Sequence, residues 1–99
     1  MASFSLLFSE TAAGQIDKLR RDRGLAKRLK AVRKTLARLE TDPRHPGLQS
    51  HEFKSLSSLQ GMKVFESYAE QDTPAAYRVF WHYGPRKGQV TIIAITSHP

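Results

Sequence analysis

The 99-residue sequence contains no cysteine, which excludes disulfide bonds, zinc–thiolate sites and a cysteine nucleophile. It also lacks long apolar stretches, because its hydrophobic runs span only a few residues and a membrane-spanning helix needs about 20. The N-terminus has no basic segment followed by an apolar core, the pattern that is typical of a signal peptide. These absences predict a cytoplasmic protein that does not insert into a membrane.

Acidic residues are scarce as well, since nine aspartate and glutamate residues stand against sixteen lysine and arginine residues. The formal net charge is +7, and residues 1–50 carry eleven of the basic side chains but only five of the acidic ones. Such an excess attracts polyanions, meaning nucleic acid, an acidic protein or an anionic membrane surface. The length predicts a single domain over residues 1–99. A domain of this size has little room for a large internal pocket, so we expect any active site to be an open face or a shallow groove.

Two amphipathic helices are predicted in the first half of the chain. Residues 3–8 (SFSLLF) fit a first strand, and Ser9 can then cap a helix that runs over residues 11–22. After a break at residues 23–24, apolar residues recur at spacings of four and three, as on one face of a second helix. This stripe consists of Leu25, Leu29, Val32, Leu36 and Leu39. Pro43 ends the helix because proline cannot continue its hydrogen bonds, and the short break predicts a helical hairpin.

The second half of the chain is predicted to form strands. Residues 44–61 are interpreted as a polar connector with a short strand around residues 51–56, and strands follow over residues 62–70, 75–83 and 89–97. A strand, two helices and then a run of strands predict an α+β fold. The helical hairpin is expected to pack on one face of a mainly antiparallel, twisted sheet of about four strands. The other face is expected to stay open.

Three features of the sequence are informative together. The first is the order of the elements, with a basic, leucine-striped second helix. The second is the strand Tyr77–Trp81 (YRVFW), and the third is an apolar last strand that ends in Ile95–His98. Together they resemble the RelE/ParE superfamily of toxins from type II toxin–antitoxin systems, which has a Tyr-Arg-aliphatic-aliphatic-aromatic strand and members in which a catalytic histidine ends the last strand. Many relatives place a tyrosine beside or after that histidine, whereas Pro99 follows it here.

The resemblance implies a metal-independent endoribonuclease, a RelE-like mRNA interferase that cleaves mRNA, often on the ribosome, and so inhibits translation. It also implies an acidic cognate antitoxin protein as a partner, with the toxin as a monomer or in a toxin–antitoxin hetero-oligomer. The superfamily also contains gyrase inhibitors of the ParE type, which act by binding protein, so the fold does not choose between these activities. A third hypothesis is a degenerate, non-catalytic RNA-binding member, because the C-terminal tyrosine is missing.

Cleavage of RNA through the 2′-hydroxyl needs a base for that hydroxyl, positive charge on the phosphate and an acid for the leaving oxygen. Arg78 matches the family's strand arginine and is the candidate for holding the phosphate; the alternative is a strand arginine paired with a glutamate. His98 is the candidate acid or base because imidazoles change protonation near neutral pH, and the alternative is a frayed terminal residue without a role. Glu66, on the strand next to Arg78, is the best-placed carboxylate for a base. The sequence does not decide which face of the sheet Glu66 points to, because Val64 and Tyr68 lie an even number of residues away, share its face and could belong to the core.

Four further residues are predicted to contact RNA. Lys54 and Lys63 are candidates for binding phosphates, against the alternative that they are ordinary solvated lysines. His82 and Phe80 share the predicted face of Arg78, and Phe80 could stack on a base there. Trp81 lies on the opposite face and is expected in the core.

No metal and no cofactor are expected. His45 and His51 lie in the connector without a partner at metal-ligand spacing, and the four histidines are scattered along a chain without cysteine. The basic second helix is interpreted as a solvated face that adds a general attraction to ribosomal RNA or to an acidic antitoxin.

Overall fold

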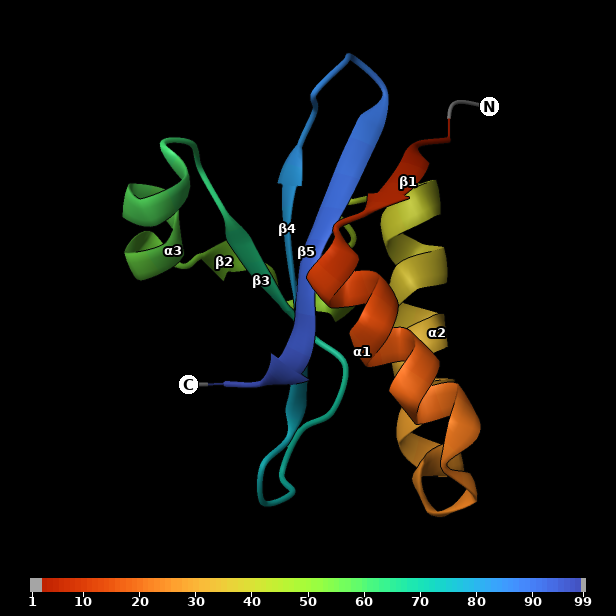
Figure 1. The fold of residues 1–99 in the computed structure, drawn as a ribbon. Coiled ribbons are helices and arrows are strands. Elements are labelled where there is room, and N and C mark those ends of the chain that lie inside the picture. Colours follow the sequence, from red (N-terminus) through yellow and green to blue (C-terminus); the bar gives the residue numbers. More distant parts are fainter. Residues whose placement is uncertain (1–2, 99) are drawn as a thin grey trace.

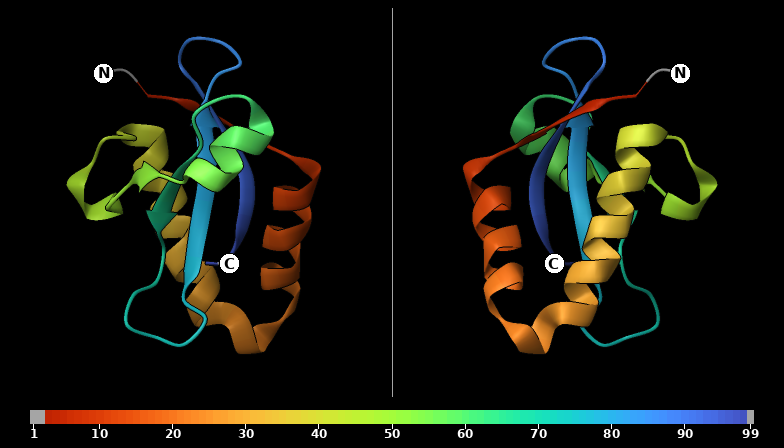
Figure 2. Two further views of the ribbon diagram at one scale, coloured as in Figure 1. Left: turned by 90° about the vertical axis from the view of Figure 1, so that its left-hand side faces the viewer. Right: turned by 90° about the vertical axis from the view of Figure 1, so that its right-hand side faces the viewer.

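The chain forms one mixed sheet with helices on both faces. The computed structural model describes residues 3–98, and in it α1 (Glu10–Arg21) and α2 (Ala26–Thr41) lie side by side on one face (Figure 1, Figure 2). A shorter helix, α3 (Lys54–Gln60), lies on the opposite face. The strands are β1 (Ser5–Phe8), β2 (His51–Glu52), β3 (Phe65–Tyr68), β4 (Tyr77–Tyr83) and β5 (Gln89–Ser97). None of the helices within residues 3–98 is long and apolar enough to cross a bilayer.

The sheet has the strand order β1-β5-β4-β3-β2. Strand β1 pairs in parallel with β5, and the other neighbouring pairs are antiparallel. The parallel pair requires a crossover, and the helical hairpin begins it directly after β1. The predicted α+β fold is therefore confirmed, with five strands in the sheet because the two-residue β2 adds a short edge strand beside β3.

The first helix begins where its cap predicts. The Ser9 hydroxyl oxygen accepts a hydrogen bond from the backbone N–H of Ala12 at 3.0 Å, which satisfies one of the free amides of the first turn. The same hydroxyl donates to the carbonyl of Ile93 at 2.9 Å. One side chain therefore starts α1 and also ties it to the last strand.

The apolar stripe of α2 packs on the sheet, as its spacing predicts. Val32, Leu36 and Leu39 are buried in one cluster with Val79 and Trp81 of β4, and the other two members of the stripe pack against this cluster. Because successive side chains of a strand point to opposite faces, this contact turns the alternate residues of β4 away from the helices. The sheet thus has an apolar face toward α1 and α2, and a second face whose residues are free for other contacts.

The connector before β3 is more ordered than the sequence indicates. Strand β2 covers only His51 and Glu52, and α3 follows directly. Gly61 ends α3 in a left-handed conformation (φ +71°), and its N–H donates to the Ser57 carbonyl, the usual way in which a glycine terminates a helix. The prediction of a strand over residues 51–56 is therefore wrong after residue 52, and α3 covers part of the face that was expected to stay open.

Candidate active site

The register of the strands gathers the candidate residues on the face that carries α3. Glu66 of β3 lies opposite His51 of β2 on one side and opposite Phe80 of β4 on the other. Arg78 lies opposite Tyr68, and on its other side it pairs with Thr96 of β5. His98 follows Thr96 by two residues, which continues the same face just beyond the end of β5.

Glu66 is the centre of this site. Its side chain is only 1% exposed, although a buried carboxylate is costly unless it is paired. One carboxylate oxygen, Oε1, lies 2.8 Å from Nε2 of His51, and the other, Oε2, contacts Nδ1 of His98. The Nε atom of Arg78 lies 3.7 Å from Oε2. Two imidazoles and one guanidinium therefore surround a single buried carboxylate.

The two imidazoles are accessible, unlike the carboxylate that holds them. The side chains of His51 and His98 are 49% and 48% exposed. When Nδ1 of His98 carries the hydrogen that Glu66 accepts, Nε2 is left with a free lone pair, as in the carboxylate–histidine pairs of hydrolases. Nδ1 of His51 lies 3.4 Å from the carbonyl oxygen of Gln49. Each ring nitrogen of His51 therefore has an oxygen beside it, Oε1 of Glu66 at Nε2 and the Gln49 carbonyl at Nδ1.

The guanidinium of Arg78 is fixed from several sides. It lies 3.9 Å from the centre of the Tyr68 ring, a cation–π contact, and its Nη1 donates to the carbonyl of Glu70 at 2.9 Å. The side chain is 15% exposed, and its buried Nε has no hydrogen-bond partner among the described residues. A buried N–H without a partner is uncommon in folded proteins, and here Oε2 of Glu66 lies 3.7 Å from it. The charges of Glu66 and Arg78 cancel, so a proton on either imidazole makes the site positive.

The structure thus brings together the predicted Arg78, His98 and Glu66, and it turns Glu66 to the same face as Arg78. The four residues predicted to contact RNA lie in different places. Lys54 is the first residue of α3 and Lys63 lies between α3 and β3, so neither lies on a strand, and both are exposed. The Nδ1 atom of His82 contacts the backbone carbonyl of Tyr83 at 2.8 Å, and no contact recorded for residues 3–98 joins His82 to Glu66.

Phe80 lies beside the site but is covered. It is 1% exposed, and its ring packs edge-on against Phe53 with 5.5 Å between the ring centres. A base cannot stack flat on a ring that is buried in this way, so in this conformation Phe80 forms part of the floor beneath the site. Trp81, expected in the core, is buried on the helical face, where its Nε1 donates to Ser67.

Three residues of the site were not found from the sequence. His51 was interpreted as a connector histidine without a partner at metal-ligand spacing; the structure places it against the carboxylate of Glu66 across a strand pair. Tyr68 supports the guanidinium of Arg78, and Phe53 lies 5.3 Å from the His98 ring. The alternation of β3 places Tyr68 beside Glu66, but nothing local reveals the pairing that brings residues 51 and 53 to the site.

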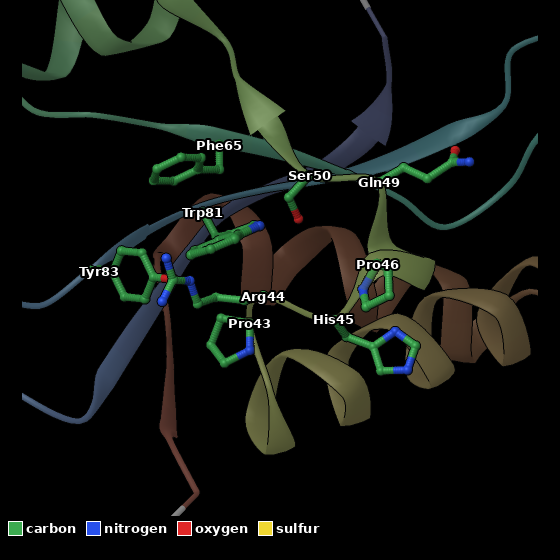
Figure 3. Close-up of a pocket in the computed structure, with 9 residues that line it drawn as sticks. All are labelled: Pro43, Arg44, His45, Pro46, Gln49, Ser50, Phe65, Trp81 and Tyr83. Atoms are coloured by element: carbon green, nitrogen blue, oxygen red, sulfur yellow. The ribbon is translucent and has the colours of Figure 1, made fainter.

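A separate hollow lies away from this site. It has a volume of about 430 Å³ and lies on the helical side of the sheet, between the segment after α2 and the aromatic residues of β3 and β4 (Figure 3). The lining residues are Pro43, Arg44, His45, Pro46, Gln49, Ser50, Phe65, Trp81 and Tyr83. These residues include no carboxylate to pair with the imidazole of His45, in contrast to the two imidazoles that contact Glu66.

Comparisons of the chain with protein-family models, with curated proteins and with solved structures give no significant match. The resemblance to RelE/ParE toxins therefore stays a prediction from the sequence.

Within residues 3–98, no group of three or more histidine, aspartate and glutamate side chains is arranged to hold a metal ion. Around Glu66, the imidazoles contact different oxygens of the carboxylate.

Proposed function

We propose that this protein is a metal-independent endoribonuclease of the RelE-like toxin type, which cleaves mRNA by attack of a 2′-hydroxyl on the neighbouring phosphate. One observation carries this proposal: a buried carboxylate holds two half-exposed imidazoles beside a fixed guanidinium. These are the groups that such a reaction needs, namely a base, an acid and a positive charge for the phosphate.

In the proposed reaction, Nε2 of His98 takes the proton of the 2′-hydroxyl, and the 2′-oxygen forms a bond to phosphorus. The bond from phosphorus to the 5′-oxygen of the next nucleotide breaks. The hydrogen on Nδ1 of His51 leaves its long, 3.4 Å contact with the Gln49 carbonyl and passes to that oxygen, while Nε2–H stays on the carboxylate of Glu66. The products are a 2′,3′-cyclic phosphate and a 5′-hydroxyl. Arg78 stabilises the negative charge that builds up on the phosphate oxygens. Glu66 is buried, so its role is to position both imidazoles rather than to contact RNA.

The surface charge supports a polyanionic substrate and an acidic partner. Ten lysine and arginine residues lie between residues 18 and 38, on or next to the two helices that cover the face away from the site. Such a surface attracts RNA, the ribosome or an acidic antitoxin over a range set by salt. The proposal also holds that this protein is cytoplasmic, that it cleaves mRNA on the ribosome, and that an acidic antitoxin binds and inhibits it.

The test is the cleavage of a defined RNA by the purified protein, with and without ribosomes, in the presence of EDTA. We expect cleavage with a 2′,3′-cyclic phosphate end, identified by mass spectrometry, and no cleavage where the attacking nucleotide carries a 2′-deoxyribose. His98→Gln is the matched variant, because it keeps a hydrogen-bonding side chain but cannot transfer a proton. Intact RNA under all these conditions, together with inhibition of gyrase supercoiling, would replace the proposal by the protein-binding alternative.

A further inference from the structure

A second hollow adjoins the proposed active site. It has a volume of about 380 Å³ and lies between α3 and strands β4 and β5. Its lining residues are Phe53, Leu56, Phe80, Ala94, Thr96 and Ser97. We refer to it as the α3 groove. Its wall is mostly apolar, and Thr96 adds a hydroxyl group on the side of β5.

The α3 groove is continuous with the groups that carry the proposed chemistry. The ring of Phe53 packs at 5.5 Å from Phe80 in the groove and at 5.3 Å from the imidazole of His98. On the other side, Thr96 of the groove pairs directly with Arg78. A group that occupies the groove therefore lies next to the imidazole of His98, which contacts the same carboxylate oxygen that Arg78 approaches at 3.7 Å.

The surroundings of the groove restrict what can enter it. A phosphate would lose its hydration against apolar walls, whereas the flat, largely apolar face of a nucleobase can be buried there and its polar edge can meet a hydroxyl. The positively charged molecule attracts a polyanion, and the charged groups that suit a phosphate lie just outside the groove. In a nucleotide chain, an apolar ring and an anionic phosphate are adjacent in this same way.

We propose that the α3 groove binds the base of one nucleotide that flanks the cleaved phosphate. This inference rests on the proposed function, and it adds that the enzyme holds its substrate by a base as well as by phosphates. It also assigns Leu56 and Phe53, which lie outside the acid–base cluster, to substrate binding.

The test uses RNA oligonucleotides that can be cleaved at a single phosphate, because only one ribose keeps its 2′-hydroxyl and the others are 2′-O-methylated. One version carries all its bases, and two versions lack the base on either side of the cleavable phosphate. We expect the wild-type kcat/KM to fall by roughly 10- to 100-fold when one of these bases is removed, the usual effect of losing one stacked base.

Leu56→Trp fills the groove and is the informative variant. It should lower kcat/KM on the complete RNA by the same factor, and it should cause no further loss on the RNA that already lacks the bound base, because both changes remove one contact. The matched control is Leu59→Trp, on the same helix but with Leu59 80% exposed, and it should cleave all versions like the wild type.

The outcomes separate the two proposals. If the wild type cleaves RNA but Leu56→Trp cleaves the complete RNA equally well, the base-binding inference is overturned and the proposed function stands. If the wild type cleaves none of the oligonucleotides, the proposed function fails. A second measurement needs no variant and still tests the inference if Leu56→Trp does not fold. It compares, by fluorescence anisotropy, the binding of fully 2′-O-methylated oligonucleotides with and without the flanking bases. Equal affinity for all versions overturns the inference.

Discussion

The two faces of the sheet are built on different physical principles. The helical face is apolar and continuous, with Val79 and Trp81 buried under the stripe of α2. The α3 face contains a buried carboxylate with two imidazoles in contact with it and a guanidinium nitrogen 3.7 Å away. The first face stabilises the fold by burying apolar area. The second face buries a charged carboxylate, which costs free energy unless the charge is paired. Such clusters of ionisable groups are typical of functional sites rather than of sites that stabilise the fold.

The comparison predicts that changes on the α3 face impair cleavage more than folding. The largest expected effect is that of His98→Ala, which should lower the cleavage rate by about 10²–10⁴-fold, the usual contribution of a general acid or base. Single-turnover cleavage of the defined RNA by the purified variant measures the loss. A wild-type rate would remove His98 from the proposed mechanism.

On the helical face the order of effects should be reversed. Leu36→Ala removes a buried side chain from the cluster under α2 and should destabilise the protein by about 2–5 kcal/mol. The fraction that stays folded should cleave RNA at the wild-type rate, because Leu36 lies on the opposite side of the sheet from Glu66. Denaturant unfolding gives the first quantity, and kcat below the unfolding transition gives the second. A loss smaller than half a kcal/mol would contradict the packing described for α2.

Variants of Arg78 test whether the guanidinium on the α3 face contributes to cleavage separately from the imidazoles. Arg78→Ala should reduce cleavage by on the order of 10²-fold through the loss of a transition-state charge. Arg78→Lys keeps the charge but not the flat guanidinium that stacks on Tyr68, so it should restore only part of the rate. Single-turnover cleavage of the defined RNA measures both variants. If the alanine variant retains toxicity in cells while supercoiling is inhibited, the ParE-type alternative gains support.

The smallest expected effect concerns the exposed lysines of α2. Lys30→Glu with Lys34→Glu reverses two exposed charges on α2, on the opposite side of the sheet from Glu66. RNA affinity should fall at low salt, and the slope of log affinity against log salt should decrease by about 0.7 for each lost phosphate contact. The value of kcat should not change. Filter binding at several salt concentrations measures the slope, and a fall in kcat alone would contradict the division between the two faces.

The same contrast explains what the sequence could predict. The stripe of α2 and the alternation of β4 are local patterns with fixed periods, so both elements and the core between them followed from the sequence. Glu66 was identified as a candidate, but its face was not, because Val64 beside β3 shares its parity and is buried. His51 and α3 could not be assigned, since the pairing of a two-residue strand across fifteen positions leaves no local signal. The site depends on long-range register, and register is set by the folded sheet as a whole.

The position of β5 has a consequence for the synthesis of the protein. This strand lies between β1 and β4 in the sheet, yet it follows the other four strands in the chain. During translation, β1 and β4 cannot pair with β5 until it has been synthesised. The pairing of β1 with β5 then closes a loop of more than eighty residues. His98 arrives directly behind that strand. The polypeptide therefore cannot bring both imidazoles to Glu66 before β5 has been made and inserted into the sheet.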